Sequence, residues 1–321
     1  MPAPLDHLDI AADHPLLRLG HLLADRGYHF TTLTPLSHQR VNARPGNAEA
    51  RTLEDVFGWS RPFRQEVVGE EVFALLREAC AVEARGELWS SRIRWSSLDG
   101  QLFVHSRYPT VNADAVFFGP DTYRFAQALH QHLARDARPL RRIADIGCGA
   151  GPGAVLAALA RPRAQVLALD INDRALAFTA VNARLAGADN LVARHSNLLH
   201  QVEGPLDLII ANPPYMLDPA GRAYRHGGGE HGAGLSLAII EAALQRLAPG
   251  GSLLLYTGVA MFGGADPFRD AFQPLLDGHA WTWRYREMDP DVFGEELDNP
   301  AYARADRIAA VVLEATRPAH D

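Results

Sequence analysis

From about residue 141 to its end, the chain alternates short apolar runs with stretches in which apolar residues recur at helical spacing. This alternation is typical of a sheet of parallel strands that are connected by helices. The apolar runs predict strands at residues 142–146, 165–169, 191–194, 206–211, 252–256, 281–286 and 308–314. The helical spacing predicts helices at residues 153–159, 173–186, 236–247 and 267–276. The predicted fold class is therefore α/β, with a doubly wound seven-stranded sheet.

The N-terminal third has a different pattern. Helical spacing covers residues 16–25 and 70–84. Between them, residues 31–47 are polar and marked by prolines, so we expect a loop there. Two β-like runs, at residues 88–95 and 101–105, flank the sequence SSLDG and predict a β-hairpin.

This change of pattern divides the chain into two expected domains. The 321 residues are enough for one large domain and a smaller one. We expect a small α+β domain over residues 1–110 and a larger α/β domain over residues 111–321. The longest apolar runs, at residues 154–160 and 208–211, are far shorter than the roughly 20 residues of a membrane helix.

The remaining composition points to the cytoplasm. The N-terminal sequence MPAPLDHLDI has early acidic residues and no basic flank, so it does not have the pattern of a secretory signal. The two cysteines, Cys80 and Cys148, suggest a reducing compartment rather than a disulfide framework. We expect a soluble cytoplasmic protein with no membrane partner.

All 31 basic residues are arginines. Because the chain has no lysine, it has neither the phosphate-binding lysine of a P-loop nor the amine that forms a Schiff base. The net charge of -7 also argues against a large phosphate-binding surface, although a local arginine patch stays possible.

A glycine-rich sequence, DIGCGAGPG, follows the first predicted strand of the sheet. Glycines at this point let the backbone turn tightly and approach a ligand at the N-terminus of the next helix. The dinucleotide fingerprint G-x-G-x-x-G, counted from Gly147, places its last glycine at Pro152, so NAD is not predicted. The spacing acid-x-G-x-G-x-G, which begins at Asp145, resembles motif I of the class I methyltransferases that bind S-adenosylmethionine.

This resemblance implies a Rossmann-like methyltransferase sheet with S-adenosylmethionine as cofactor. The cofactor carries an ammonium group and no phosphate, and an acid before the glycines suits a cation. Asp170, at the end of the second predicted strand, is placed to accept hydrogen bonds from ribose hydroxyls. Asn197 stands where the family often has a third acid, and its amide oxygen can accept from the adenine amine. The implied cofactor-binding residues are Asp145, Gly147, Cys148, Gly149, Gly151, Asp170, Ile171, Asn197, Leu198 and Asn212.

A second motif, ANPPYM, directly follows the fourth predicted strand. Ligands of open α/β sheets bind at the carboxyl ends of the strands. The motif resembles the [ND]-P-P-[YFW] sequence of amino methyltransferases that act on planar nitrogens. The resemblance implies that the Asn212 side chain and the Pro213 carbonyl accept hydrogen bonds from the nitrogen, while Tyr215 offers it an aromatic face. The implied catalytic residues are Asn212, Pro213, Pro214 and Tyr215.

Two flanking stretches resemble the release-factor glutamine methyltransferases. The sequence FFGPDTYRFAQAL at residues 117–129 is similar to their P-x-T-E-x-L-V-x-x-A-L stretch, with Gly119 and Tyr123 in place of the usual arginine and glutamate. Residues 227–255 resemble their glycine-rich loop, helix and L-x-P-G-G turn. The resemblance implies methylation of a protein glutamine, with residues 1–110 selecting the substrate. Candidate substrate contacts are Thr122, Tyr224 and Arg225.

Other functions stay open at this point. The same motif serves enzymes that methylate the exocyclic amines of adenine or guanine in RNA or DNA, and a small-molecule amine is a further possible acceptor. A different class of function is a cofactor-binding fold whose N-terminal domain binds a partner without catalysis. The sequence predicts a macromolecular partner but gives no oligomeric state.

A metal site is not predicted. His226, Glu230 and His231 lie close together in the sequence, but a glycine-rich loop does not preorganise ligands. The chain has no H-E-x-x-H or C-x-x-C sequence. We expect this segment to form a mobile lid over the substrate instead.

Overall fold

The computed structural model describes residues 10–218, 221–222 and 224–319. The prediction that the chain has no secretory signal concerns its first residues, and residues 1–9 lie outside the described ranges.

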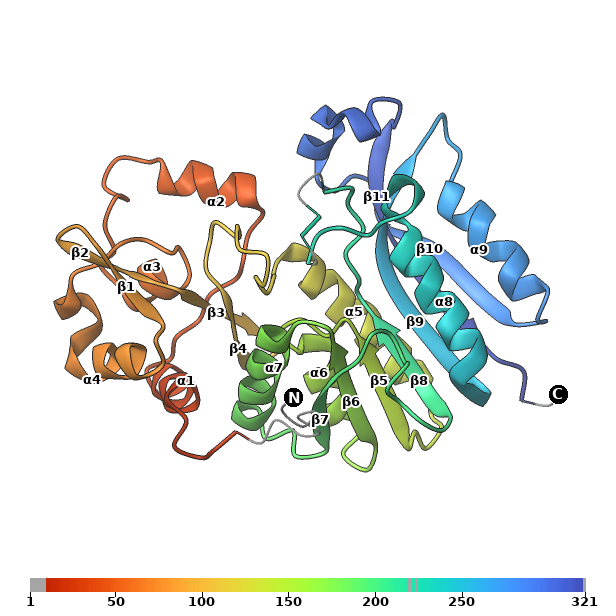
Figure 1. The fold of residues 1–321 in the computed structure, drawn as a ribbon, viewed down its shortest axis with the longest axis horizontal. Coiled ribbons are helices and arrows are strands. Elements are labelled where there is room, and N and C mark those ends of the chain that lie inside the picture. Colours follow the sequence, from red (N-terminus) through yellow and green to blue (C-terminus); the bar gives the residue numbers. More distant parts are fainter. Residues whose placement is uncertain (1–9, 219–220, 223, 320–321) are drawn as a thin grey trace, which may run out of the picture.

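A seven-stranded sheet fills the C-terminal two thirds of the chain, in the order β10-β11-β9-β8-β5-β6-β7 (Figure 1). Neighbouring strands from β9 to β7 are parallel, whereas β11 is antiparallel to both β9 and β10. The predicted doubly wound α/β sheet is confirmed, and β9 extends well beyond the predicted strand. The strands are β5 (Arg142–Ile146), β6 (Gln165–Asp170), β7 (Leu191–His195), β8 (Leu206–Ala211), β9 (Leu247–Met261), β10 (Thr282–Asp289) and β11 (Arg307–Thr316).

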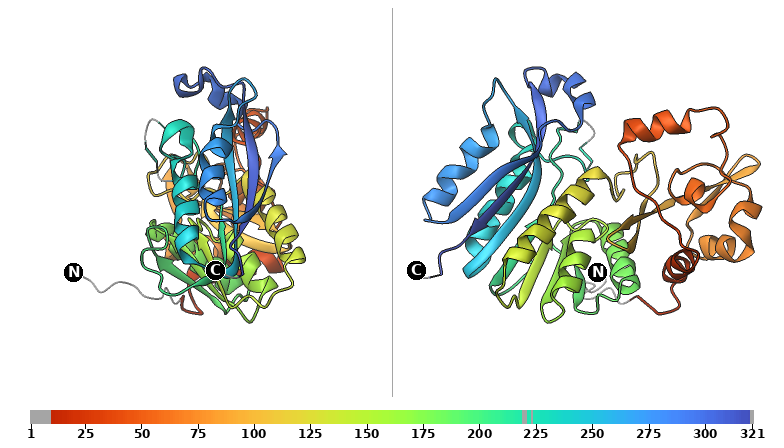
Figure 2. Two further views of the ribbon diagram at one scale, coloured as in Figure 1. Left: turned by 90° about the vertical axis from the view of Figure 1, so that its right-hand side faces the viewer. Right: turned by 180° about the vertical axis from the view of Figure 1, so that it is seen from behind.

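Side chains along the central strands alternate between two buried cores. In β8, Leu208 and Ile210 belong to one core, while Ile209 and Ala211 belong to the other. Helices cover both faces of the sheet (Figure 2). The first face packs against α5 (Pro120–Arg135), α6 (Pro152–Ala160) and α7 (Asp173–Leu185), and the second against α8 (Gly234–Arg246) and α9 (Pro267–Asp277). Because both faces are apolar, polar side chains gather where the strands end.

The N-terminal part is a smaller α+β arrangement. Its strands β3 (Ile93–Leu98) and β4 (Gln101–Ser106) form the expected hairpin, whereas β2 (Leu88–Ser91) pairs with β1 (Val82–Arg85). Its helices are α1 (Pro15–Asp25), α2 (Pro35–Asn42), α3 (Leu53–Phe57) and α4 (Gln65–Glu78). Short 3-10 turns elsewhere are η1 (Glu230–Gly232), η2 (Gly294–Asp298) and η3 (Pro300–Tyr302). None of the helices within the described ranges is long and apolar enough to cross a bilayer.

Two predictions for the N-terminal part are wrong. Residues 31–47, expected to be a loop, contain α2, whose first residue is Pro35. The Thr34 hydroxyl caps this helix by accepting from the Ser37 backbone N–H at 3.3 Å. The helix predicted at residues 70–84 begins where expected, after a non-helical residue at Gly69 (φ 80°) within α4. It ends at Glu78 and not at residue 84, because the backbone turns through the left-handed region at Cys80 (φ 52°) and continues as β1.

One buried side chain joins the N-terminal part to the sheet. Asn182, on α7, has no exposed surface. Its amide oxygen accepts from the Val104 N–H at 2.8 Å, and its amide nitrogen donates to the carbonyls of Val104 (3.1 Å) and Ala150 (2.8 Å). Since Val104 lies in β4 and Ala150 follows β5, a single amide connects the hairpin to the glycine-rich segment.

Replacing this amide should destabilise the whole protein. We expect Asn182→Ala to lower the free energy of unfolding by about 2 to 4 kcal/mol, because a buried N–H and two carbonyls lose their partner. Asn112→Ala, which removes the same group from an exposed position, should change it by less than about 0.5 kcal/mol. Urea unfolding of both variants measures the difference, and equal small changes would contradict the role given to Asn182.

Candidate functional site

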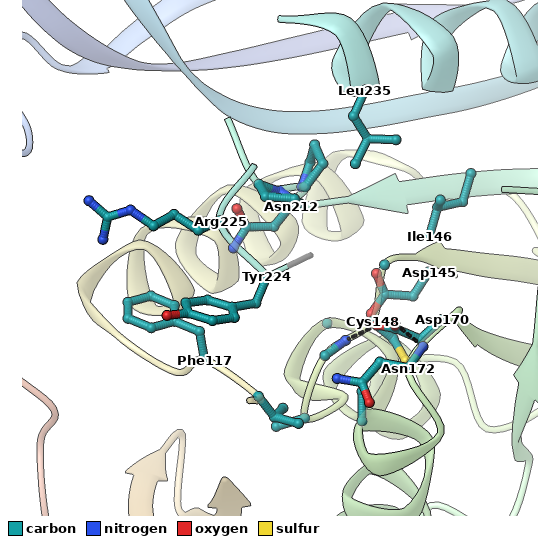
Figure 3. Close-up of a pocket in the computed structure, with 18 of the residues that line it drawn as sticks. Phe117, Asp145, Ile146, Cys148, Asp170, Asn172, Asn212, Tyr224, Arg225 and Leu235 are labelled. Atoms are coloured by element: carbon teal, nitrogen blue, oxygen red, sulfur yellow. Dashed lines mark hydrogen bonds between the residues drawn. The ribbon is translucent and has the colours of Figure 1, made fainter. Parts of the chain in front are cut away.

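A pocket of about 240 Å³ opens at the carboxyl ends of β5, β6 and β8 (Figure 3). Its walls are the glycine-rich segment after β5, the end of β6, the turn after β8 and the start of α5. The site therefore lies where the strands of an open α/β sheet present their ligands.

The glycine-rich segment forms a tight turn along one wall. Gly147, Gly149 and Gly151 have φ values of 70°, 58° and 79°, a left-handed region that favours glycine. The N–H groups of Gly147 and Cys148 donate to the Leu169 carbonyl at 2.8 and 3.0 Å. These bonds fix the segment to the end of β6, and α6 begins directly after it.

Asp145 is a carboxylate inside β5, only 2% exposed. Its Oδ2 accepts from the Ala154 N–H, in the first turn of α6, at 2.8 Å. Gly153 makes room for this contact, because a Cβ there would lie 2.8 Å from the same oxygen. Burial raises the pKa of Asp145 to about 7; the hydrogen bond from Ala154 lowers it, and the nearby Asp170 carboxylate raises it.

Asp170 ends β6 and lines the same part of the pocket. Its two oxygens accept from the N–H groups of Gly149 and Asn172, both at 2.9 Å. Burial raises the pKa of Asp170, against the effect of these backbone bonds. Neither carboxylate is within ion-pair distance of a described arginine. A buried and a half-buried acid, neither paired with a described arginine, make a site that suits a cation.

The NPPY turn (residues 212–215) leaves β8 in the middle of the pocket. In Figure 3, Asn212 lies between two groups of side chains, with Asp145 and Asp170 on one side and Phe117 and Tyr224 on the other. We call these the acidic half and the aromatic half of the pocket. Asn212 therefore borders both halves of the pocket.

The aromatic half is held by contacts between distant parts of the chain. The Tyr224 hydroxyl donates to the Thr110 carbonyl at 2.6 Å. Arg225 is engaged by Glu296, a residue of η2. Phe293, which also lines the pocket, has a left-handed backbone with φ 54°. Such strain is typical of residues that the surrounding structure holds in place at a site.

The segment after the NPPY turn packs directly against it. The Met216 N–H donates to the Arg225 carbonyl at 3.1 Å, and the Gly227 N–H donates to the Met216 carbonyl at 2.9 Å. A Cβ at Gly227 would lie 2.7 Å from the Pro214 carbonyl oxygen, so only glycine fits. The segment expected to be a lid thus supports the turn over part of its length.

The histidines of this segment have protein partners. His226 Nδ1 accepts from the Asp218 backbone N–H at 3.2 Å, and the ring of His231 packs on Phe262 with centroids 4.4 Å apart. Across the described ranges, no three histidine, cysteine, aspartate or glutamate side chains are grouped to hold a metal ion.

The structure brings nearly all predicted site residues to this pocket. Gly151 does not line it and lies instead at the start of α6. The Thr122 hydroxyl accepts from the Gly119 N–H at 3.2 Å and so caps α5. The predicted residues that line the pocket are Thr122, Asp145, Gly147, Cys148, Gly149, Asp170, Ile171, Asn197, Leu198, Asn212, Pro213, Pro214, Tyr215, Tyr224 and Arg225.

Among the lining residues that were not predicted, three matter most to the site: Phe117, Asp121 and Phe293. The first two lie in or beside the sequence FFGPDTYRFAQAL, so that stretch was a usable signal. Phe293 lies between β10 and β11 in a segment without a motif, and its place in the pocket comes only from the fold.

Comparisons with known proteins agree with this geometry. The methyltransferase small domain family matches residues 109–261. A release factor glutamine methyltransferase of Deinococcus radiodurans is 31% identical over 262 residues, which cover 76% of this chain and 86% of that protein. A ribosomal protein uL3 glutamine methyltransferase of Bordetella pertussis is 36% identical over 165 residues, covering 47% of this chain and 54% of that protein.

A third relative has a different named substrate. The 4-amino-L-phenylalanine/4-methylamino-L-phenylalanine methyltransferase of Streptomyces pristinaespiralis is 34% identical over 121 residues, covering 34% of this chain and 41% of that protein. The resemblance inferred from the glycine-rich and NPPY motifs is confirmed. The chain belongs to the family of S-adenosylmethionine-dependent methyltransferases that contains the release factor glutamine methyltransferases and is built on the methyltransferase small domain.

Proposed function

We propose that this enzyme methylates the side-chain amide nitrogen of a glutamine in a protein. The observation that carries the proposal is the position of Asn212 between the acidic and the aromatic half of the pocket. The names of the relatives that act on release factor and on ribosomal protein uL3 support glutamine as the acceptor.

The acidic half fits the cofactor by its chemistry. S-adenosylmethionine supplies a methyl group on a positively charged sulfur and also carries an ammonium group. The carboxylates of Asp145 and Asp170 balance this charge, and Asp170 accepts from ribose hydroxyls. Burial raises the pKa of the Cys148 thiol, so Cys148 acts as a small packing group and not as a nucleophile. The proposed binding residues are Asp145, Gly147, Cys148, Gly149, Gly151, Asp170, Ile171, Asn197, Leu198 and Asn212.

The NPPY turn orients the acceptor. An amide nitrogen is a poor nucleophile, because its lone pair is delocalised into the carbonyl. The Asn212 side-chain oxygen and the Pro213 carbonyl accept hydrogen bonds from the two N–H groups of this amide nitrogen. These bonds direct its lone pair at the methyl group. Pro213 and Pro214 have fixed φ angles and no N–H groups that could compete. Phe117 and Tyr224 enclose the side chain of the acceptor in the aromatic half.

The surface around the pocket favours a protein over a nucleic acid. Leu33 and Leu36, on either side of the pocket residue Pro35, are 36% and 41% exposed. Val111, next to the Thr110 carbonyl that holds Tyr224, is 62% exposed. In the proposal these side chains contact a protein substrate, since apolar surface suits a protein contact better than a phosphate backbone. Residues 1–110 contain 12 arginines and 14 acidic residues, a balance that does not attract phosphates.

These features also suggest which part of the chain selects the substrate and which part carries catalysis. We infer that residues 1–110 select the substrate and that residues 111–321 carry cofactor binding and catalysis. Both cysteines are free thiols, which supports a cytoplasmic location for the reaction.

The acceptor class can be tested directly. Incubating the enzyme with tritiated S-adenosylmethionine and an extract of cells that lack it should label material that protease removes and nuclease does not. Label removed by nuclease would identify a nucleic acid instead. Label that passes a small-pore filter, separates from S-adenosylmethionine by chromatography and is absent when the enzyme is omitted would identify a small amine, the acceptor class of the Streptomyces relative.

Asn212→Ala should separate cofactor binding from catalysis. The variant loses one acceptor for the amide N–H, so we expect methyl transfer to fall by about a hundredfold or more. Asn212 is also one of ten proposed cofactor-binding residues, so the dissociation constant for S-adenosylmethionine, measured by isothermal titration calorimetry, should rise by no more than about threefold, far less than the loss in rate. Full activity of the variant on the labelled acceptor would refute the proposed role of the turn.

Asp145→Asn should stabilise the free protein and weaken cofactor binding. Because the folded pKa of Asp145 is raised, the folded state holds a proton that the unfolded state has lost between about pH 4 and 7. Stability from this group is therefore present below pH 4 and is lost as the pH rises through about 7.

Urea unfolding without cofactor should thus show equal stabilities of wild type and Asp145→Asn near pH 4, and a more stable variant at pH 8. Calorimetry at pH 8 should show weaker binding of S-adenosylmethionine to the variant. A variant that is no more stable at pH 8, or that binds the cofactor normally, would contradict the electrostatic account of the acidic half.

Leu36→Asp should weaken docking of a protein substrate. Leu36 lies in the first turn of α2, where an acidic residue is compatible with the helix. We expect KM for the labelled protein to rise about tenfold, with kcat and cofactor affinity unchanged. Leu159→Asp, at a similarly exposed leucine (39%) at the end of α6, is the matched control. Equal KM values for the two variants would exclude this surface as a docking site.

A further inference from the structure

Asp121 is a buried carboxylate next to the pocket that the proposed mechanism does not use. It lies in the first turn of α5, is 5% exposed and lines the pocket wall. An ionised side chain at such a place requires hydrogen-bond donors around it, because burial without partners is costly. The hydrogen-bond donors around Asp121 connect it to the NPPY turn.

Three side chains donate to this carboxylate. The Tyr215 hydroxyl donates to Oδ2. On Oδ1, the Tyr256 hydroxyl donates at 2.7 Å and Arg124 Nη1 at 3.2 Å. Arg124 is itself held by Asp289 at 2.8 Å. Burial raises the pKa of Asp121, and the hydrogen bonds from the tyrosines lower it. The carboxylate is thus fixed on one oxygen by β9 and α5, and its other oxygen is left for Tyr215.

The side chain of Tyr215 is buried and is held by contacts on its ring and on its hydroxyl. It is 6% exposed. Its ring lies on the bare backbone of Gly258 in β9, where a Cβ would overlap ring carbons Cδ2, Cε2 and Cζ. Phe293 meets the ring edge to face, with centroids 6.1 Å apart. With its hydroxyl on Asp121, the ring is an anchor of the turn and not a freely adjustable stacking surface.

The NPPY turn is therefore held at both ends. Its first end continues β8, where Ala211 pairs with Ile146 on one side and Leu255 on the other. Its second end is Tyr215. Between them stand only Asn212 and two prolines, whose φ angles are fixed by their rings. Moving the Tyr215 hydroxyl would therefore move the Pro213 carbonyl and the Asn212 side chain.

We propose that Asp121 is a positioning residue for methyl transfer, which sets the orientation of Asn212 and Pro213 by holding the hydroxyl of Tyr215. The inference rests on the proposed function, since it presumes that Asn212 and Pro213 hold the acceptor nitrogen. Misplacing such acceptors by about 1 Å can cost a hundredfold in rate.

Two tyrosine variants provide the test, because each removes one hydroxyl that donates a hydrogen bond to the buried carboxylate of Asp121. Tyr215→Phe loses the hydroxyl that belongs to the turn, and Tyr256→Phe loses the one that belongs to β9. For Tyr215→Phe we expect kcat to fall at least about tenfold, while the dissociation constant for S-adenosylmethionine stays within about twofold. For Tyr256→Phe we expect kcat within about twofold of wild type, because Arg124 still holds Oδ1. Asp121→Asn should resemble Tyr215→Phe.

The assay uses tritiated S-adenosylmethionine and dilutions of an extract from cells that lack the enzyme, so that kcat and KM separate. Thermal unfolding of each variant records stability in parallel. If Tyr215→Phe and Tyr256→Phe lose stability and activity to the same degree, Asp121 is merely structural and the inference is overturned. If Tyr215→Phe keeps full kcat while Asn212→Ala is inactive, the inference fails and the proposed function stands. Full activity of Asn212→Ala would instead refute the proposed function.

A glycine pair gives an independent test that leaves Asp121 intact. Gly258→Ala places a methyl group into the Tyr215 ring without backbone strain, since its φ is not positive. Gly294→Ala adds the same group in open space, also without a positive φ. We expect Gly258→Ala to lower kcat at unchanged cofactor affinity, and Gly294→Ala to leave both unchanged. Unchanged kcat in Gly258→Ala would show that the position of the ring does not matter to the turn.

Discussion

The alternation of side chains between two apolar cores is the constraint on which the rest of the structure depends. The apolar residues of β5, β8 and β9 face one core or the other, so polar groups lie mainly at strand ends. Because the strands are parallel, these ends meet at one edge, and the glycine-rich segment, Asp170 and the NPPY turn converge there. Asp145 is a buried acid within a strand. Its burial is possible only because α6 offers it a backbone N–H and Gly153 offers it space.

The sequence was most informative about features that depend on residues close together in the chain. Strand positions followed from apolar runs, and the two motifs followed their strands directly, so their convergence could be predicted from topology alone. The helix α2 was missed because its pattern is polar; its signal was the cap at Thr34 and Pro35 and not an apolar face. The helix end at Glu78 was missed because apolar spacing continues into β1, and a left-handed residue is not visible in periodicity.

The walls of the site were less predictable because they are made by distant residues. Asp121 and Tyr215 are 94 positions apart, and Tyr224 and Thr110 are 114 apart. No local pattern requires either contact. The N-terminal part takes part in the same way, since Asn182 joins β4 to the carbonyl of Ala150 in the glycine-rich segment. The domain that is expected to select the substrate and the loop that is expected to bind the cofactor thus share one rigid frame.

The contact between Tyr215 and Gly258 also has an evolutionary consequence. As long as the ring is present, position 258 cannot acquire a side chain without displacing it. A lineage that first lost the ring at position 215 would be free to accumulate larger residues at position 258. From that state a single reversion to tyrosine would meet an occupied site. Once a larger residue occupies position 258, replacement of Tyr215 is therefore harder to reverse than it was to make.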